Sequence, residues 1–493
     1  MPACAVEDGR SLTGDFGTDF EMLRELFRLD GTFRFREVRA GAGMRCALLY
    51  LDGMVNNELI YNAVIRPLLL SEPAKGDPAQ WLRETALYAG DVKAGAKVRD
   101  LLRALLYGDS VLLVEGAATA LLINTKGFRT RGISEPENEA VQKGPREGFD
   151  EVAMLNLSQL RRRLQTPDLA VEVLRVGRRT DTMVFVCYLA SLARPRLVRE
   201  VRRRLEEISI DGILDANYIA ELTRDHAFSL FETTGSSERP DVIASKLLEG
   251  RVALIVDGTP VVLTVPYLFC ENFQSDEDYY QSFWVSSVGR LLRYVSFFLT
   301  VSVPALYLAL LTHHTRLLPT FLLLSAAQSR AGVPFSSLTE CLALIVILEL
   351  LGETGARMPQ QLGHTLSIVG GLVVGQAAVE ARLVSAPMLI VVALSGIAGL
   401  MVPRLRGAVL YARVGMVLLA AVLGLPGCFL GLTVIAVRLM GLSSYGVPYL
   451  SPLEHPDLQG LKDTAWRLPW RFMRTRPAFS RNSVRQRWGK RRE

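Results

Sequence analysis

The sequence has few cysteines, and their spacing suits neither a metal site nor a framework of disulfides. The six cysteines among 493 residues are scattered along the chain, without the close pairs that zinc ligands form. Scattered thiols are typical of a reducing compartment, in which cysteines stay free and buried. The five histidines also lack ligand spacing. We therefore expect no metal, no cofactor and no disulfide.

A catalytic set and a nucleotide-binding loop are missing as well. Paired acids suited to acid and base chemistry would need a pocket, and no histidine or nucleophile accompanies them in a recognisable pattern. Gly108 and Gly250 are not followed by the Lys and Ser or Thr of a phosphate-binding loop, so packing explains them better. The sequence therefore predicts a protein that is not an enzyme.

The N-terminus lacks a cleavable signal peptide, because no basic start precedes an apolar core. The first 290 residues carry a charge every few positions, whereas charges are sparse from Leu291 to Met440. A mean hydropathy of +0.23 with 22% charged residues is therefore the average of two unlike halves. We expect a soluble region that stays in the cytoplasm, followed by a membrane domain.

The C-terminal tail sets the expected orientation. From Trp466 to Glu493 it has ten Lys or Arg and one acid, an excess that is retained on the cytoplasmic side of a membrane. Both ends are then cytoplasmic. Arginines mixed with aromatics also suit nucleic acid, but anionic lipid explains the same residues. We expect membrane lipid as the partner and no nucleic acid, with the tail's aromatics at the headgroups.

Five apolar stretches follow the soluble region, at about 291–311, 338–352, 365–381, 384–402 and 414–437. A helix that crosses the hydrocarbon needs roughly 20 residues, and two ends on one side require an even number of crossings. We therefore expect four crossings, with the short stretch 338–352 as a re-entrant or interior helix. The segment 316–335 is short and interrupted by proline, which favours a place at the interface or folded back into the protein.

Polar residues at membrane depth are costly and call for a reason. Glu349 and Glu353 are spaced i, i+4 and share one side of a helix. Such side chains could line a cation path. Alternatively, Glu340, Glu353 and Glu380 could mark helix ends in the headgroup region, with Arg357 and Arg382 as local partners. The candidates for the ion path are Glu349, Glu353, Glu340, Gln376 and Glu380.

The soluble half contains a faint duplication. Residues 105–125 and 247–266 share one plan of Leu-Leu, a glycine turn, an apolar strand, an acid with glycine, and a second apolar strand. Glu115-Gly116 and Asp257-Gly258 would be two-residue hairpin turns. The expected fold is an α/β cytoplasmic domain built from two similar subdomains, followed by an α-helical transmembrane domain. We expect a variable segment at 1–39, subdomains at 40–133 and 175–290, a charged connecting motif at 134–174, the transmembrane domain at 291–440 and a basic tail at 441–493.

The connecting motif is dense in both signs of charge, and Gly144-Pro145 separates its first part from an expected helix at 148–164. A solvated helix with salt bridges would explain the charges. An interface between subunits explains them as well, because leucines face a core while the arginine run meets the preceding acids. The interface candidates are Glu135, Glu139, Arg146, Arg161, Arg162 and Arg163.

Four motifs together resemble a known family. They are EPENEAVQKGPREGF with the following NLSQLRRRL, AAQSRAGVPF, SIVGGLVVGQAAVEARLVSAPMLIVVAL, and SSYGVPYLSPL at 443–453. The chain resembles the A subunit of GerA-type spore germination receptors over about residues 40–455. The family usually has Arg where this chain has Lys143, and the first 40 residues and the basic tail match nothing distinctive.

The resemblance implies an oligomeric protein, a pentamer, in the inner membrane of dormant spores. It implies a permease-like B subunit that binds the nutrient, a lipoprotein C subunit, and a ligand-gated channel whose release of monovalent cations starts germination. A related sporulation channel that amplifies germination without sensing a nutrient would share this fold. A secondary transporter working alone is a further alternative, although it predicts an inverted repeat that the membrane half does not show. A non-conducting scaffold is the third.

Overall fold

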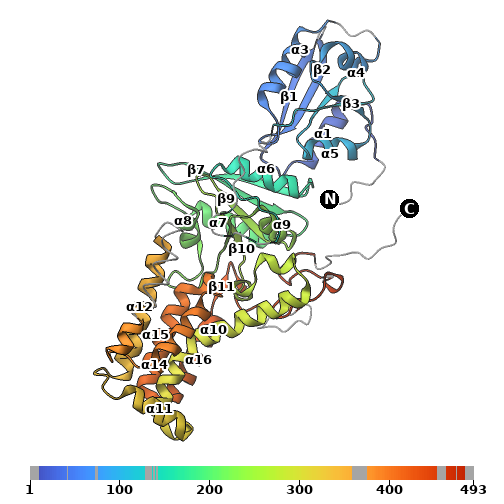
Figure 1. Cartoon of the computed structure of the whole chain (residues 1–493). Helices are drawn as coiled ribbons and strands as arrows, with labels where there is room; N and C mark the ends of the chain where they lie inside the picture. The colour runs from blue at the N-terminus through green and yellow to red at the C-terminus, as the bar shows by residue number, and fades with distance from the viewer. Residues whose placement is uncertain are drawn as a thin grey trace.

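The computed structural model describes residues 10–40, 43–72, 76–127, 136, 139, 141, 143–357, 373, 375–451, 462–473 and 475–482. These residues form three parts, which follow one another from the top of Figure 1 to its foot. An N-terminal five-stranded sheet lies at one end, a second five-stranded sheet lies in the middle, and a bundle of helices forms the other end.

The first sheet has the strand order β1-β2-β4-β5-β3, and each neighbouring pair is antiparallel. Its strands are β1 (Phe33–Ala40), β2 (Met44–Leu51), β3 (Val92–Gly95), β4 (Ser110–Val114) and β5 (Ala120–Ile123). Its helices are α1 (Phe16–Leu26), α2 (Asn57–Leu59), η3 (Ile60–Ile65), α3 (Arg66–Leu70), α4 (Pro78–Trp81), η4 (Leu82–Ala86) and α5 (Val98–Leu106).

The second sheet has the order β6-β7-β9-β10-β8, which is the order of the first sheet shifted by five strands. Its strands are β6 (Leu169–Val176), β7 (Thr182–Leu189), β8 (Gly235–Ser237), β9 (Val252–Val256) and β10 (Val262–Val265). Its helices are α6 (Ala153–Arg163), α7 (Pro195–Glu206), α8 (Ala216–Thr223) and α9 (Pro240–Leu248). The two sheets therefore share one topology, and the stretches that match in sequence form the equivalent hairpins β4–β5 and β9–β10.

The turns of these hairpins differ from the prediction. Residues 115–119 and 257–261 connect the strands, so the expected two-residue turns are wrong. The register explains the difference, because Leu112 pairs with Leu121 and Ile255 pairs with Val262, which leaves longer loops beyond the last pairs. Gly116 and Gly258 still take positive φ angles of 79° and 91° in these loops.

Strands β4 and β9 are apolar at nearly every position because both faces of each sheet are covered. Leu112 and Leu113 point into different hydrophobic clusters on opposite faces of the first sheet. Leu254 and Ile255 do the same in the second sheet. Continuous apolar runs are typical of strands buried on both faces, so the sequence pattern and the layered fold agree.

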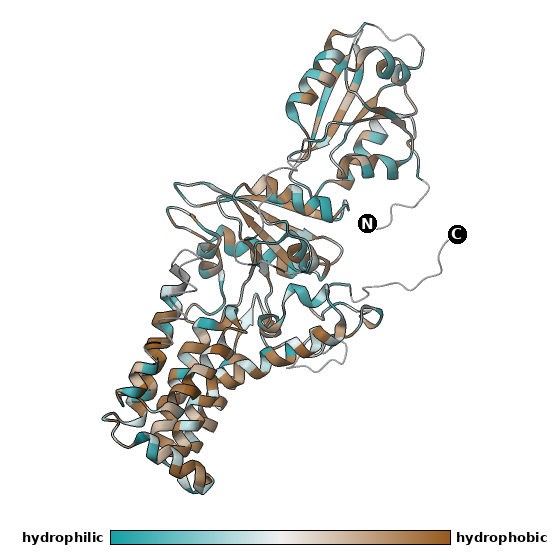
Figure 2. Cartoon of the chain, in the orientation of Figure 1, coloured by the Kyte–Doolittle hydropathy of each residue, from teal (hydrophilic) through white to brown (hydrophobic). Residues whose placement is uncertain are grey.

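The bundle contains α10 (Phe283–Thr312), α11 (Thr320–Arg330), α12 (Ser337–Arg357), α14 (Ala386–Gly399), α15 (Arg406–Leu423) and α16 (Leu425–Met440). Two helices of the described part, Phe283–Thr312 and Pro403–Leu423, are long and apolar enough to cross a membrane. Figure 2 shows apolar residues along much of the bundle's length. The count of four crossings stays a prediction.

The bundle also differs from the prediction in two helices. The stretch 414–437 is not one helix, because Gly424 takes a φ of 67° and separates α15 from α16. The stretch 338–352 is not a short segment, since it lies within the 21-residue helix α12. Most of the stretch 365–381 lies outside the described residues.

Candidate coupling site between the second sheet and the bundle

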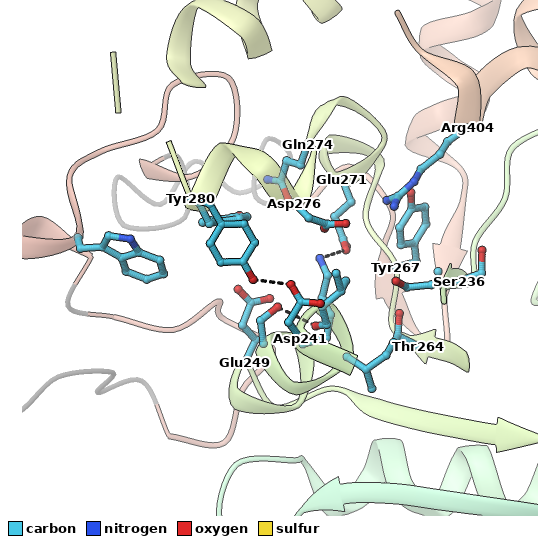
Figure 3. A pocket seen from close by; sticks show the side chains of 18 residues that line it. Ser236, Asp241, Glu249, Thr264, Tyr267, Glu271, Gln274, Asp276, Tyr280 and Arg404 are labelled. Carbon is cyan, nitrogen blue, oxygen red and sulfur yellow. Dashed lines mark hydrogen bonds and ion pairs between the residues drawn. The ribbon is translucent and has the colours of Figure 1, made fainter. Parts of the chain in front are cut away.

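A cavity of about 180 Å³ lies where the second sheet meets the helical bundle (Figure 3). Its walls come from β8, α9 and β10, and from the short helices η5 (Phe269–Phe273) and η6 (Asp276–Tyr279). Arg404, at the start of the bundle helix α15, and Trp470, in the C-terminal segment, complete the lining. Residues from three distant parts of the chain therefore meet at this cavity.

A buried carboxylate holds one wall of the cavity together. Glu271 is 2% exposed and accepts hydrogen bonds from Arg251 Nη1 at 2.7 Å and Lys246 Nζ at 2.5 Å. It also accepts the backbone N–H of Leu268 at 2.7 Å. Burial raises the pKa of Glu271, but the two cations outweigh burial and the net pKa is lowered. The charge of Glu271 is thus fixed and structural.

Asp241 and Asp276, two further acids of the cavity, differ in how closely a cation approaches them. Asp241 Oδ2 accepts hydrogen bonds from Arg239 Nη2 at 2.7 Å and from the Tyr280 hydroxyl at 2.5 Å. Asp276 lies farther from a cation, 3.9 Å from Arg239 Nε. Burial raises the pKa of Asp276 to about 6, against the opposing effect of Arg404. This carboxyl therefore changes charge close to neutral pH.

The connecting motif supplies a link between the sheet and the bundle. Glu139 Oε2 accepts hydrogen bonds from the Ser237 hydroxyl at 2.6 Å and from the Glu238 N–H at 3.1 Å. Its other oxygen, Oε1, accepts a hydrogen bond from Arg404 Nη2 at 3.1 Å. Glu139 was predicted at an interface between subunits, and the structure places it at a junction within one chain.

The chain that follows α16 returns to the second sheet and fixes the end of the bundle there. It forms β11 (Ser443–Ser444) and β12 (Val447–Pro448). The Tyr445 hydroxyl donates a hydrogen bond to Thr223 Oγ1 in α8 at 2.6 Å, and the ring lies 4.4 Å from the guanidinium of Arg204. Ser444 Oγ accepts the N–H of Tyr267 at 2.9 Å. The described part of the motif SSYGVPYLSPL, residues 443–451, therefore connects the bundle to the second sheet and α8.

The start of the bundle is fixed in a similar way. Arg290 in α10 is fully buried and donates to Asp278 Oδ2 at 2.8 Å and Asp463 Oδ1 at 2.7 Å. Asp278 lies in η6, and Asp463 lies in the C-terminal segment. The start of the bundle is thus bound to η6 and to the C-terminal segment.

The described part of the tail packs against protein more than was predicted. Arg467 and Phe479 are buried, and the Phe479 ring lies 5.0 Å from the guanidinium of Arg251. Trp466 and Trp470 remain 43% exposed. The expectation that the aromatics of the tail face headgroups is therefore wrong for Phe479, whose ring packs with Leu268 and Cys270.

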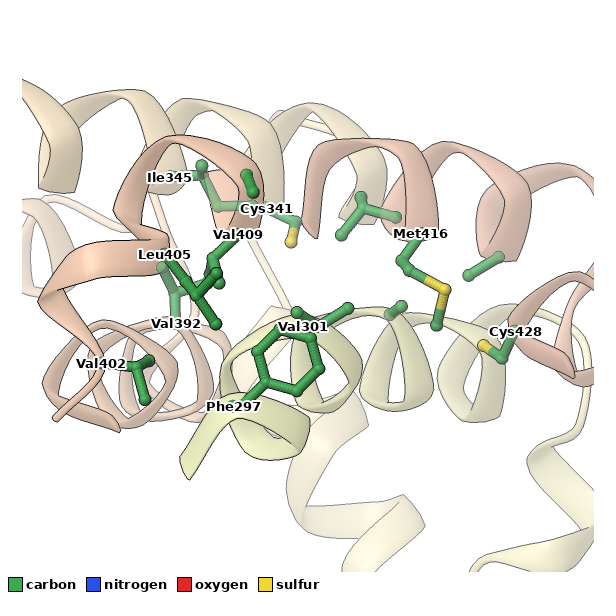
Figure 4. Close-up of a cluster of buried hydrophobic side chains, with 14 of the residues drawn as sticks. Phe297, Val301, Cys341, Ile345, Val392, Val402, Leu405, Val409, Met416 and Cys428 are labelled. Carbon is green, nitrogen blue, oxygen red and sulfur yellow. The ribbon is translucent and has the colours of Figure 1, made fainter. Parts of the chain in front are cut away.

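The polar residues predicted for an ion path do not converge on one point. Glu349 lies 2.5 Å from Arg413 and 3.6 Å from Arg406, both on α15. Gln376 Nε2 donates to Glu380 Oε1 at 2.9 Å on an exposed helix face, and Glu353 is also exposed. Figure 4 shows the apolar core around which these helices pack, from Phe297 of α10 to Met416 of α15.

Glu340, unlike the other candidates for the ion path, is buried and bound to a neighbouring helix. It is 1% exposed, and its Oε1 accepts both the N–H and the hydroxyl of Ser385 at 2.6 Å. Ser385 precedes the first residue of α14, so the carboxylate lies at the positive end of that helix. Its contact joins α12 to α14.

The arginines of the connecting motif lie in different surroundings. Arg161 is 2% exposed and donates to both carboxylate oxygens of Asp30 at 2.6 Å, so its predicted role between subunits is wrong for this buried, intrachain pair. Arg162 and Arg163 lie 3.5 Å and 2.7 Å from Glu147. Arg146 is exposed, and Glu135 lies outside the described residues.

The sequence prediction missed Arg290, Arg404 and Arg413 as linking residues. Arg413 carried a signal that could have identified it, because an isolated arginine within an apolar helix needs an acid partner. Arg290 and Arg404 lie at the edges of apolar stretches, where arginines usually face headgroups or solvent. The pattern alone did not distinguish that role from a buried contact with Asp278 or Glu139.

The chain has two copies of one α/β topology, bound to a helical bundle in which two helices could cross a membrane. This combination is that of a membrane-associated protein with a large α/β region. The chain matches the family model described as "Bacillus/Clostridium GerA spore germination protein" over residues 21–479. It belongs to the GerA family of spore germination proteins, which confirms the resemblance in the sequence motifs.

Several similar proteins are named spore germination proteins, and the similarity extends over most of their length. Spore germination protein KA of Bacillus subtilis is 40% identical over 460 residues, which cover 92% of this chain and 85% of that protein. Spore germination protein GerLA of Bacillus cereus is 33% identical over 470 residues, with 94% and 96% covered. The crystal structure of the N-terminal domain of the A subunit of the Bacillus megaterium spore germinant receptor GerK3 is 30% identical, with a TM-score of 0.42. It covers 53% of this chain and 98% of that domain.

Proposed function

We propose that this protein is the A subunit of a nutrient-responsive spore germination receptor. It assembles as an oligomer, a pentamer, in the inner membrane of the spore, with both termini on the core side. A permease-like B subunit binds the nutrient, and a lipoprotein C subunit completes the receptor. The A subunits form a cation channel whose opening starts germination. Membership of the GerA family supports this proposal, together with the two helices that could cross a membrane.

The double attachment of the bundle to the second subdomain carries the mechanism. Arg290 fixes the first helix through Asp278, and Tyr445 fixes the chain after the last helix through Thr223. α8 packs on the second sheet, and η6 lines the cavity beside it. Because both ends of the bundle are held against one subdomain, a movement of that subdomain is passed to the helices as a unit. A nutrient can drive such a movement only by binding the open arrangement more tightly than the closed one.

Glu349 is the best candidate for the ion path. Its side chain is 27% exposed, and its charge is balanced here by Arg413. We assign this paired arrangement to the closed state and place Glu349 on the cation path when the pair separates on opening. Glu353, Gln376 and Glu380 are exposed on the bundle and are the further candidates. Glu340 acts through its contact with Ser385, as a positioning residue.

The partly exposed end of α6 is the proposed contact between subunits. Arg162 and Arg163 retain 29% and 24% exposure beside Glu147. Arg162→Glu should lower the oligomeric mass in detergent, whereas Arg175→Glu on the exposed edge of the second sheet should leave it unchanged. An unchanged mass for Arg162→Glu would remove this contact from the proposal.

Potassium release from spores tests the function as a whole. Spores with and without the gene are exposed to a panel of amino acids, sugars and nucleosides, and potassium in the medium is followed. Loss of prompt release for one nutrient class supports a dedicated receptor subunit. Slower release for every nutrient would favour an amplifying channel instead. Ion currents from the purified protein in planar bilayers separate a channel from a scaffold, and saturable substrate exchange would indicate a carrier.

A further inference from the structure

The first three turns of α10 have an inverted distribution of polar and apolar side chains. The buried residues of these turns are all polar, namely Ser286, Ser287 and Arg290. Five large apolar side chains of the same turns are 50–62% exposed, and they are Trp284, Val285, Val288, Leu291 and Leu292. At 100° per residue, these apolar side chains and Val295 occupy one arc of about 120°. A helix with this distribution has its polar side against the protein and its apolar side outward.

The polar side is bound by neighbouring segments. Ser286 Oγ donates to the Asp278 carbonyl at 2.7 Å, and Ser287 Oγ donates to the Arg467 carbonyl at 3.1 Å. Together with the contacts of Arg290, these bonds fix the rotation of the helix about its axis. The outward direction of Trp284 and Leu291 is therefore imposed by the fold.

The C-terminal segment extends this apolar face with an aromatic side chain. The Trp466 ring packs edge-on against Trp284, with 6.2 Å between the ring centroids and an angle of 89°. Trp470, a few residues later, instead contacts Tyr279 of η6 and lines the cavity. Tryptophan is enriched at membrane interfaces, where its ring is half in contact with acyl chains and its N–H stays in polar surroundings. The face thus has the composition of an interfacial belt.

The length of α10 sets the depth of this face. Thirty residues extend about 45 Å, which matches a bilayer with its headgroup layers, whereas the hydrocarbon alone is about 30 Å thick. Residues 294–312 carry no charge, whereas Arg290 and Arg293 precede them, so the surplus of about ten residues falls on the first three turns. In Figure 1 the start of α10 lies under the second sheet, apart from the other bundle helices.

We infer that the first three turns of α10, with Trp466, form a platform embedded in the headgroup layer of a phospholipid bilayer. The platform supports the second sheet at the membrane surface and connects it to the bundle. The inference rests on the proposed membrane location. Continuity with a helix long enough to span supports lipid over a second copy of the chain as the occupant of this face.

Depth-dependent quenching of tryptophan fluorescence tests the inference on the full chain. Trp81, Trp466, Trp470 and Trp488 are replaced by Phe so that only Trp284 remains, and the protein is reconstituted into vesicles of brominated phospholipid. Loss of Trp284 fluorescence should be greatest with bromine near the headgroups and smaller with bromine near the bilayer centre. A chain that retains only Trp81, in the first subdomain, should not be quenched by either lipid.

A tryptophan at a second position tests the membrane location separately from the platform. In a chain with all five tryptophans replaced by Phe, Val422→Trp places the probe on the outer face of α15, where Val422 is 74% exposed. Quenching of this probe without quenching of Trp284 would overturn the platform and leave the membrane location standing. Absence of quenching at both positions would overturn the membrane location as well. Disulfide formation between two copies of Leu292→Cys, with Trp284 unquenched, would assign the face to a second copy and overturn the inference.

Discussion

The carboxylate of Glu139 accepts a hydrogen bond from the Arg404 guanidinium at 3.1 Å, although 265 positions separate the two residues. Glu139 lies in the connecting motif between the two subdomains, and Arg404 immediately precedes α15. Because the other oxygen of Glu139 accepts a hydrogen bond from Ser237 of the second sheet, one side chain touches both the sheet and the bundle.

Removal of either charge of this pair should weaken the coupling between sheet and bundle. Glu139→Gln and Arg404→Gln should each slow nutrient-triggered potassium release at unchanged protein level. Because both act on one contact, the double variant should be less impaired than the sum of the single variants. The coupling energy should be about 1–2 kcal/mol, as is usual for a partly buried charged hydrogen bond. Strict additivity in a double-mutant cycle would contradict a direct contact.

The buried pair of Arg161 and Asp30 should contribute to stability far more than its surface neighbours do. Asp30→Asn leaves the guanidinium of Arg161 buried without an anion, which should cost about 3–5 kcal/mol. Arg162→Met, which removes a partly exposed contact with Glu147, should cost less than about 1 kcal/mol. Thermal unfolding of the purified chain in detergent compares the two. Similar losses of stability in both variants would show that the burial of Arg161 does not determine how much its ion pair stabilises the fold.

The duplication and the family could be predicted from the sequence, whereas most contacts within the fold could not. The repeated hairpins were visible because strands buried on both faces leave a long apolar pattern, as at Leu112 and Leu254. The roles of Arg161 and Glu139 were not visible, because their partners Asp30 and Arg404 are far away in the chain. The break at Gly424 was hidden for another reason, since the flanking residues are equally apolar. Patterns of local composition therefore identified the layers, and tertiary contacts decided the site.

Glu349 should have two separable roles, one in stability and one in ion flux. Glu349→Gln alone leaves Arg413, which is 2% exposed, without its anionic partner, so the amount of assembled protein should fall. In the double variant Glu349→Gln, Arg413→Met the unpaired charge is gone, and the amount should recover. Cation flux is then compared at matched protein level. Wild-type flux in the double variant would remove Glu349 from the ion path.

The Asp276 carboxyl should make stability depend on pH at the junction. Burial raises its pKa from 3.8 to about 6, so the folded state binds this proton more tightly than the unfolded state does. Its contribution therefore favours folding most below the unfolded pKa of 3.8 and is lost as the pH rises to about 6. Asp276→Asn should raise the free energy of unfolding near neutral pH by at most about 3 kcal/mol and change it little near pH 4. Thermal unfolding in detergent over this range measures the difference, and a gain independent of pH would contradict the assignment.

Gly424 should be required for the break between α15 and α16. Its φ of 67° and ψ of −139° are accessible to glycine and strained for other residues. A Cβ at this position would also lie 2.7 Å from His314 Cε1 and 2.9 Å from His313 Cβ. Gly424→Ala should therefore cost at least about 1–3 kcal/mol. The matched control is Gly415→Ala in α15, where a Cβ meets nothing within 4 Å and the change should stabilise the helix by roughly 0.5–1 kcal/mol. Thermal unfolding of both variants in detergent should show opposite signs. Equal stabilisation would mean that no break exists at Gly424 and that the apolar stretch 414–437 is one continuous helix.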